Sequence, residues 1–288
     1  ARHKDTLRRH SHIIAATKPD VLLWPEASTP YAINEDPAWV ENISKKTHLP
    51  MIVGAVTKSV DPPRSYNSVC SISPERGLIR KYYAKRALVP FGEYIPKGFG
   101  WIPNLNKLVG PTGRFEPGGD ARTISLDVNS TENTLKVGPL ICYEDIFPHL
   151  ARDTTTQGAD FLFISTNNAW FGEEGCAEQH AAHSVLRAIE NRRPVLRSGN
   201  AGWSGWIDEQ GVRRSVMKDE NGSVYFEGAA TFSISRTLSR IDKETFFSKY
   251  GDWFPYACMP LCGLVFLRKG KINNLIVYRQ HAFNSMNN

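Results

Sequence analysis

The chain has 288 residues, of which 41% are hydrophobic and 22% are charged. This length and balance predict a folded protein with a well-buried core and exclude a disordered or collagen-like chain. The net charge of +6 suits an anionic surface such as phospholipid headgroups, but scattered basic residues without a zinc-finger or RNP-like pattern predict no nucleic-acid partner.

The first third of the sequence alternates helix and strand patterns. A short apolar run stops at Pro25, which predicts a strand buried on both faces with Glu26 at its carboxyl end. In chain order we expect a helix ending near residue 16, strands over 21–24 and 51–56 separated by a helix over 38–47, and an antiparallel pair over 69–72 and 78–82.

A Gly/Pro-rich segment over residues 90–119 interrupts this pattern, and a stretch of that size is usually a functional loop. Alternation then resumes. The expected elements are strands over 137–143, 161–165 and 194–197, helices over 147–157 and 178–191, and a hairpin over 206–212. Strands alternating with helices, with hairpins inserted, predict an α/β sandwich.

The five cysteines do not form a disulfide framework or a metal site. Their number is odd, none forms a CxxC pair, and none lies at zinc-ligand spacing from a histidine. We therefore expect no metal and at least one free thiol, with Cys258 and Cys262 as buried, small apolar groups.

Three residues of different chemistry share one context, at or just beyond the end of an apolar strand. They are Glu26, Lys85 and Cys142. Ligands of open α/β sheets bind at the carboxyl ends of strands, so these residues offer a base, a positive charge and a nucleophile at one edge. By chemistry alone, each is also compatible with an ordinary role: a helix cap, a solvated lysine and a small core residue.

Several longer motifs support the first interpretation. They are WPE (24–26), YAKRALVPFGEYIP (83–96), ICYED (141–145), NNAWFG (167–172) and the later QH, RAIENRRPVLR and NAG segments. Together they resemble the apolipoprotein N-acyltransferase family of the carbon-nitrogen hydrolase, or nitrilase, superfamily. The resemblance runs in order from about Pro19 to Trp253.

The resemblance implies a nitrilase-type α-β-β-α sandwich over residues 1–250, truncated at its N-terminus. It also implies that residues 251–288 are an apolar segment and basic tail left from a transmembrane helix. The apolar run over 253–267 contains two prolines and is shorter than the roughly 20 residues that a spanning helix needs.

For the site, the resemblance implies that Glu26 is the general base, Lys85 the oxyanion stabiliser and Cys142 the nucleophile, with Glu93 as a second essential carboxylate. It implies further substrate-binding residues beside the nucleophile and near the acyl group: Tyr143, Glu144, Trp170 and Phe171. Asn168 departs from the family motif, which has Asp there.

The implied reaction is transfer of a fatty acyl chain from a phospholipid, through a cysteine thioester, to the amine of a diacylglyceryl-cysteine at a lipoprotein N-terminus. The implied enzyme is a monomer without cofactors, located in the bacterial inner membrane with this domain on the periplasmic side. Apolar residues of the long loop, over 99–108, are expected to form a lipid-facing lid.

Two other hypotheses remain. A soluble nitrilase-like amidase would use the same three residues on a small amide, with water as the acceptor. A membrane-associated binding domain would keep only a vestige of the site. The long PFGEYIP and AWFG motifs argue against the first, and the intact set of Glu26, Lys85, Glu93 and Cys142 argues against the second.

Overall fold

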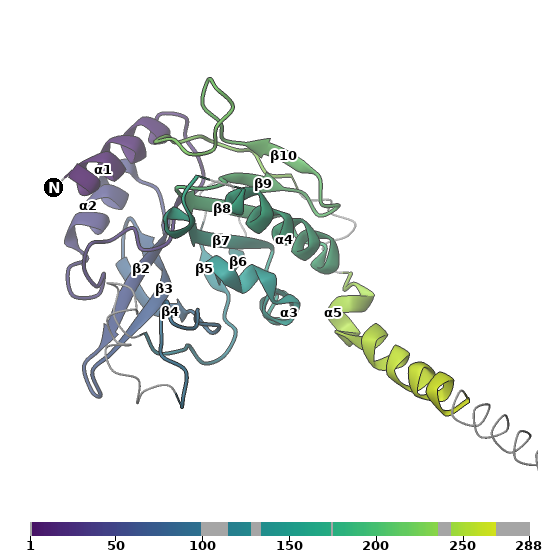
Figure 1. The fold of residues 1–288 in the computed structure, drawn as a ribbon. Coiled ribbons are helices and arrows are strands. Elements are labelled where there is room, and N and C mark those ends of the chain that lie inside the picture. Colours follow the sequence, from purple (N-terminus) through teal and green to yellow (C-terminus); the bar gives the residue numbers. More distant parts are fainter. Residues whose placement is uncertain (1, 99–114, 128–133, 174, 236–242, 269–288) are drawn as a thin grey trace, which may run out of the picture. The chain divides into compact units, whose positions relative to one another are not determined.

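The computed structural model describes residues 2–98, 115–127, 134–173, 175–235 and 243–268. The chain divides into two units, Ala1–Ser248 and Lys249–Asn288. Nearly all of the helices and strands lie in the first unit, so that unit determines the geometry of any site (Figure 1).

The first unit contains a four-stranded sheet with two helices on its outer face (Figure 1). In the order β1-β2-β3-β4, β1 and β2 are parallel and the other neighbours are antiparallel. The elements are α1 (Arg2–Ala15), β1 (Leu22–Trp24), α2 (Ala38–Thr47), β2 (Met51–Ser59), β3 (Arg64–Ser73) and β4 (Gly77–Ala84).

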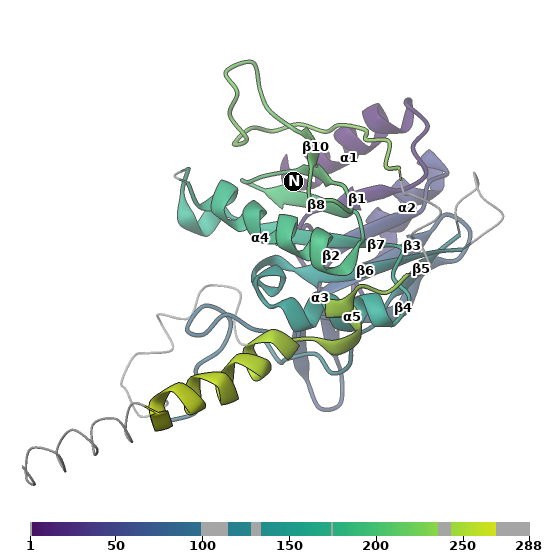
Figure 2. The same ribbon diagram turned by 90° about the vertical axis from the view of Figure 1, so that its right-hand side faces the viewer.

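A second, six-stranded sheet packs on the first and carries α3 and α4 on its other face (Figure 2). Its order is β10-β9-β8-β7-β6-β5, with β6, β7 and β8 parallel. The elements are β5 (Ile124–Leu126), β6 (Leu135–Ile141), η2 (Cys142–Ile146), α3 (Pro148–Thr156), β7 (Phe161–Asn167), η3 (Ala169–Phe171), α4 (Cys176–Asn191), β8 (Val195–Asn200), β9 (Gly205–Ile207), β10 (Arg213–Val216) and α5 (Phe246–Tyr250).

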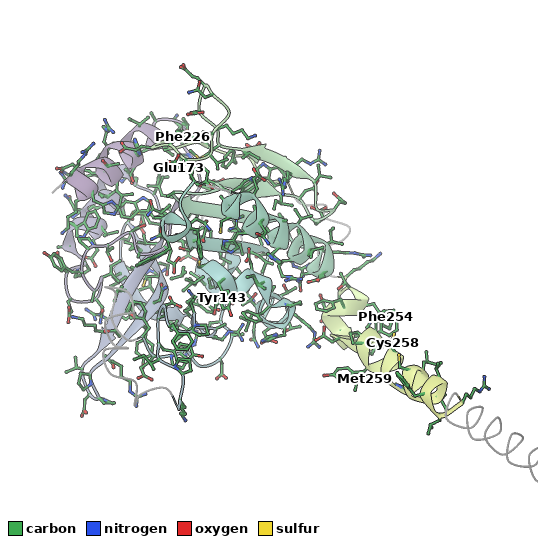
Figure 3. The ribbon with its side chains drawn as sticks, in the orientation of Figure 1. Tyr143, Glu173, Phe226, Phe254, Cys258 and Met259 are labelled. Atoms are coloured by element: carbon green, nitrogen blue, oxygen red, sulfur yellow. The ribbon has the colours of Figure 1, made fainter. Side chains whose placement is uncertain are left out.

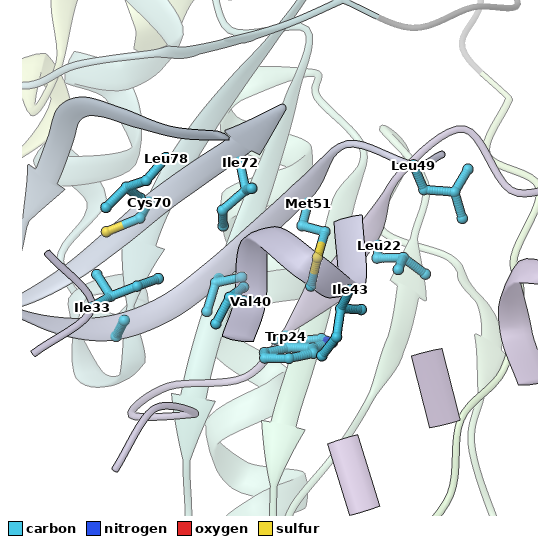
Figure 4. Packing of buried hydrophobic residues seen from close by; sticks show 12 residues of the cluster. Leu22, Trp24, Ile33, Val40, Ile43, Leu49, Met51, Cys70, Ile72 and Leu78 are labelled. Carbon is cyan, nitrogen blue, oxygen red and sulfur yellow. The ribbon is translucent and has the colours of Figure 1, made fainter. Parts of the chain in front are cut away.

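Strand alternation separates the core into three layers. Along β2, Met51 and Val53 face the helices, whereas Ile52 faces the other sheet. Along β7, Phe163 faces the first sheet and Leu162 faces α3 and α4. Figure 4 shows the helix-side layer of the first sheet. These layers confirm the predicted α/β sandwich, in which both sheets contain parallel and antiparallel strands.

Among the differences from the sequence expectations, two concern cysteines. The strand expected over 137–143 ends at Ile141, and Cys142 begins the short helix η2. The prediction that Cys258 and Cys262 are buried was wrong, because the first is half-buried and the second exposed. The expected lid over 99–108 lies outside the described residues.

Within the second unit, residues 253–268 form a helix with exposed large apolar side chains. Figure 3 labels Phe254, Cys258 and Met259 along it. Over the described part of the chain, no helix combines the length and the apolar character needed to cross a membrane.

Candidate active site

The three residues predicted to carry the chemistry each follow a strand, either directly or after one intervening residue. Glu26 follows β1 after Pro25, Lys85 follows β4, and Cys142 follows β6. The two sheets approach closely beneath Glu26, since a Cβ added at Gly54 of β2 would lie 2.2 Å from Ser165 Oγ and 2.7 Å from Glu26 Cα. A side chain at position 54 would therefore push the sheets apart at this edge.

Lys85 lies between two carboxylates. Its Nζ is 2.9 Å from each carboxylate oxygen of Glu93 and 3.6 Å from Glu26 Oε1. The side chain is almost fully buried, and burial alone would lower its pKa. Attraction to Glu26 and Glu93 outweighs that effect and raises the pKa of Lys85, so the ammonium stays charged at neutral pH.

The backbone holds Lys85 and Glu93 in place. Lys85 N donates to the carbonyl oxygen of Asn67 at 2.8 Å, and Gly118 N donates to the carbonyl oxygen of Lys85 at 2.7 Å. Val89 N donates to Glu93 Oε2 at 2.9 Å, which fixes the second carboxylate at the head of the long loop. The backbone on both sides therefore supports the contact between Lys85 and Glu93.

Asn67 on β3 forms hydrogen bonds to both carboxylates, although no sequence motif pointed to it. Its Nδ2 donates to Glu26 Oε1 at 2.6 Å and to Glu93 Oε1 at 3.0 Å. The available signal was an asparagine inside an otherwise buried strand, since such a buried amide needs partners. Asn67 thereby fixes the position of Glu26 relative to Glu93.

Cys142 has an unusual backbone and an unusual thiol. Its φ of +51° lies in the left-handed region, which is rare for a residue with a side chain. Burial, and then the negative charge of Glu26, raise the pKa of the Cys142 thiol to about 12, although Lys85 and the end of β7 act in the opposite direction. The thiol is therefore protonated at neutral pH and needs a base to react.

Glu144 joins the turn that carries Cys142 to the segment that carries Lys85. Its fully buried carboxylate accepts hydrogen bonds from Ile141 N at 2.7 Å, Tyr83 Oη at 2.8 Å, Arg86 N at 2.6 Å and Ala87 N at 3.1 Å. Burial raises its pKa, although these hydrogen bonds oppose the shift. This geometry favours a positioning role for Glu144 over the direct substrate contact expected from the sequence.

The aromatic residues expected at the substrate differ in exposure. Tyr143, which is labelled in Figure 3, is half-buried. Its ring meets that of Phe147 edge-on at 5.0 Å. Trp170 and Phe171 form η3 after β7, and each is 59% exposed. Their substrate contacts stay predictions.

A large cavity lies elsewhere. It occupies about 1180 Å³ along α1, β1 and the segment 224–234, and none of Glu26, Lys85, Glu93 and Cys142 lines it. The cavity adjoins the edge of the four-stranded sheet. That sheet has two strands fewer than the six-stranded sheet packed against it. Within the described residues, no group of His, Cys, Asp and Glu side chains has the arrangement of a metal site.

The chain resembles known proteins in sequence. The sequence model of the carbon-nitrogen hydrolase family matches residues 4–232. An apolipoprotein N-acyltransferase of Geobacter metallireducens is 33% identical over 264 residues, covering 88% of this chain and 47% of that protein. Apolipoprotein N-acyltransferase 2 of Treponema denticola is 32% identical, covering 86% and 47%. The chain thus spans about half the length of these curated relatives.

Solved structures support the same fold. A carbon-nitrogen hydrolase from Helicobacter pylori superposes with a TM-score of 0.55 at 18% identity, covering 75% of this chain and 80% of that one. A mutant amidase of the nitrilase superfamily from Nesterenkonia superposes with a TM-score of 0.56 at 13% identity, covering 75% and 80%. At such low identity these matches show the fold alone.

Proposed function

Because the chain belongs to the carbon-nitrogen hydrolase family, we propose that it is the catalytic part of an apolipoprotein N-acyltransferase, with Cys142 as the nucleophile. The observation that carries the chemistry is the buried ammonium of Lys85 between Glu26 and Glu93, coupled electrostatically to the Cys142 thiol. The choice of acceptor rests on the relatives at 32% and 33% identity.

The first half-reaction forms a thioester. Glu26 removes the proton of the Cys142 thiol as Sγ attacks the ester carbonyl of a phospholipid. Lys85 stabilises the negative charge on the carbonyl oxygen of the tetrahedral intermediate. The carbonyl then reforms, the bond to the alcohol oxygen breaks, and the proton on Glu26 passes to that oxygen, releasing a lysophospholipid.

The second half-reaction forms the amide. The α-amino group of the diacylglyceryl-cysteine attacks the thioester carbonyl and gives a proton to Glu26. The bond between carbonyl carbon and Sγ breaks as the amide forms, and the proton on Glu26 returns to the Cys142 sulfur. The enzyme regains its starting state, and no cofactor takes part.

The proposed location is the bacterial inner membrane, with the catalytic unit on the periplasmic side, as a monomer. Exposed apolar side chains support an association of residues 253–268 with lipid. They include Phe254, Leu261, Leu264 and Phe266, each at least 58% exposed. The net charge of +6 suits anionic headgroups.

The second candidate is an amidase that hydrolyses a small amide with the same residues. Glu26, Lys85 and Cys142 favour it as well, because a base, a positive charge and a thiol can act on an amide carbonyl as on an ester. The two candidates differ in the acceptor, which is water for the amidase and a lipopeptide amine for the transferase.

The test is to incubate the chain with phospholipid vesicles and a synthetic diacylated lipopeptide and to follow the lipopeptide by mass spectrometry. We expect a product that is heavier by one acyl group, and none with Cys142→Ala. Cys70→Ala is the matched control, because Cys70 is also a buried thiol but lies in the helix-side core. Hydrolysis of small amides without acylated lipopeptide would support the amidase instead.

A further inference from the structure

A buried polar network lies behind the turn that carries Cys142, and the proposed chemistry does not use it. The short helix η2 packs against α4, which crosses the six-stranded sheet in Figure 2. His180, Ser184 and Arg187 are buried and follow one another at helical spacing, so they share the face of α4 that meets the turn. A polar stripe on the buried face of a helix requires an explanation.

Of these three residues, His180 is the one that contacts the backbone of Cys142 itself. Its Nε2 lies 3.1 Å from the carbonyl oxygen of Cys142 and 2.9 Å from Asp145 Oδ1. Both of these oxygens are acceptors, so Nε2 carries the hydrogen. Asn168 Nδ2 lies 3.2 Å from Nδ1 and donates to it, so the Nε2–H is the one directed at the turn.

Asp145 anchors this histidine. Its fully buried carboxylate accepts from Ser184 Oγ at 2.6 Å and forms an ion pair with Arg197. Burial alone would raise the pKa of Asp145, but Arg197 and His180 together lower it. Arg197 balances the charge of this carboxylate, and His180 adds a hydrogen bond to it.

Arg187 holds the same turn through its backbone. Its Nη1 donates to the carbonyl oxygens of Asp145 at 2.8 Å and Ile146 at 3.0 Å. The left-handed backbone of Cys142 is strained and persists only where its surroundings impose it. The contacts from α4 supply that constraint.

The direction of the Cys142 carbonyl also sets the direction of the N–H on the opposite side of the peptide bond. In a trans peptide the C=O and N–H point in opposite directions, and here that N–H belongs to Tyr143. The Cys142 side chain packs in the layer between the sheets, whereas α4 covers the other face. A carbonyl turned toward His180 therefore turns the Tyr143 N–H toward the side on which the thiol lies.

We propose that His180 is a positioning residue that fixes the Cys142–Tyr143 peptide, so that the Tyr143 N–H stabilises, beside Lys85, the oxyanion formed when Cys142 attacks an ester. Asp145 acts through His180 by holding its N–H in place. The inference rests on the proposed role of Cys142 as the nucleophile.

The test compares two reactions of the same thiol. Acylation by a p-nitrophenyl fatty ester passes through an oxyanion, whereas alkylation by iodoacetamide does not. Stopped-flow release of p-nitrophenol gives the acylation rate constant, and peptide mapping gives the alkylation rate at Cys142. His180→Met removes the N–H donor at similar volume, His180→Gln keeps a donor, and His183→Met is the control on the half-buried part of α4.

We expect His180→Met to slow acylation by roughly 10- to 100-fold, somewhat less than complete loss of an oxyanion donor, with KM and alkylation changed less than about 3-fold. His180→Gln recovers most of the acylation rate, and His183→Met matches the unmodified chain. Acylation at the normal rate in His180→Met, or equal losses of acylation and alkylation, would overturn the inference.

Ser184→Ala is the milder variant if His180→Met does not fold. It removes one donor to Asp145 and leaves His180 intact, so acylation again falls more than alkylation; equal effects on both reactions contradict the inference. Cys142→Ala separates this test from the proposed function. If that variant still released p-nitrophenol in a burst, the nucleophile assignment itself would fail.

Discussion

At the scale of single residues, Lys85, Glu26 and Glu93 form a buried set with one net negative charge. Ionising Cys142 to a free thiolate would add a second negative charge, which explains why burial and Glu26 raise its pKa. Moving the proton from Cys142 to Glu26 leaves the total charge unchanged. The site therefore favours proton transfer during attack over a standing thiolate.

The raised pKa of Cys142 predicts a loss of stability at alkaline pH. The folded thiol ionises at about 12, against an ordinary value of 9.0, so the folded state holds the proton more tightly than the unfolded state. Its contribution is full below pH 9 and is lost as the pH rises toward 12, by up to about 1.4 kcal/mol per pH unit.

Urea unfolding at pH 8 and pH 10 measures this effect. Cys142→Ser removes the titrating group, so its free energy of unfolding should fall less between the two pH values than that of the unmodified chain. Cys262→Ser, at an exposed cysteine, should fall as much as the unmodified chain does. Equal slopes for Cys142→Ser and the unmodified chain would contradict the burial argument.

Asn67 gives a second prediction at this scale. Asn67→Ala removes the amide that holds Glu26 and Glu93 together, so we expect the kcat of acyl transfer to fall by roughly 10-fold or more with little change in KM. Asn34→Ala is the control, because the Asn34 amide forms hydrogen bonds too, but with the backbone of Lys58 on β2 and not with residues of the site. An unchanged kcat in Asn67→Ala would rule out a positioning role.

At the scale of elements, Glu144 couples the end of β6 to the segment after β4. Glu144→Gln places an amide N–H₂ opposite N–H and O–H donors, so we expect a loss of about 2 to 4 kcal/mol in the free energy of unfolding. Thermal and urea unfolding measure it, with exposed Glu173→Gln as the control. A loss below 0.5 kcal/mol would mean that the carboxylate is not needed as an acceptor.

The sequence predicted the elements whose residues carry a local pattern. The apolar run ending at Pro25 predicted β1 and the place of Glu26, and the alternation of strands with helices along the chain predicted the sandwich. Asn67 and His180 were missed because their roles depend on partners that are 41 and 38 residues away in the chain. The end of β6 was missed because the left-handed turn at Cys142 leaves no local signal in an apolar segment.

At the scale of the whole molecule, the division after Ser248 places the proposed catalytic residues and the exposed apolar helix over 253–268 in different units. All three core layers lie in the first unit, so a chain ending at Tyr250 should fold. Its melting temperature should lie within about 3 °C of that of the full chain, since the truncation leaves all three core layers complete.

The same truncation tests the proposed membrane association. Co-sedimentation with phospholipid vesicles should fall by roughly 10-fold or more when residues 251–288 are removed, because each large apolar side chain transferred from water contributes about 1.5 to 3 kcal/mol. A full-length chain with Phe254, Leu261 and Phe266 replaced by Ser should show the same loss. Vesicle binding that survives both changes would place the lipid contact elsewhere.

Detection of the acylated enzyme tests most directly the proposal that Cys142 carries the acyl group as a thioester. The chain is incubated with phospholipid vesicles without acceptor, quenched in acid and digested, and its peptides are analysed by mass spectrometry. We expect one fatty acyl group on the peptide that contains Cys142, removed by hydroxylamine or by a diacylated lipopeptide. An acyl group on another residue, or lipopeptide acylation by a chain that never acylates Cys142, would contradict it.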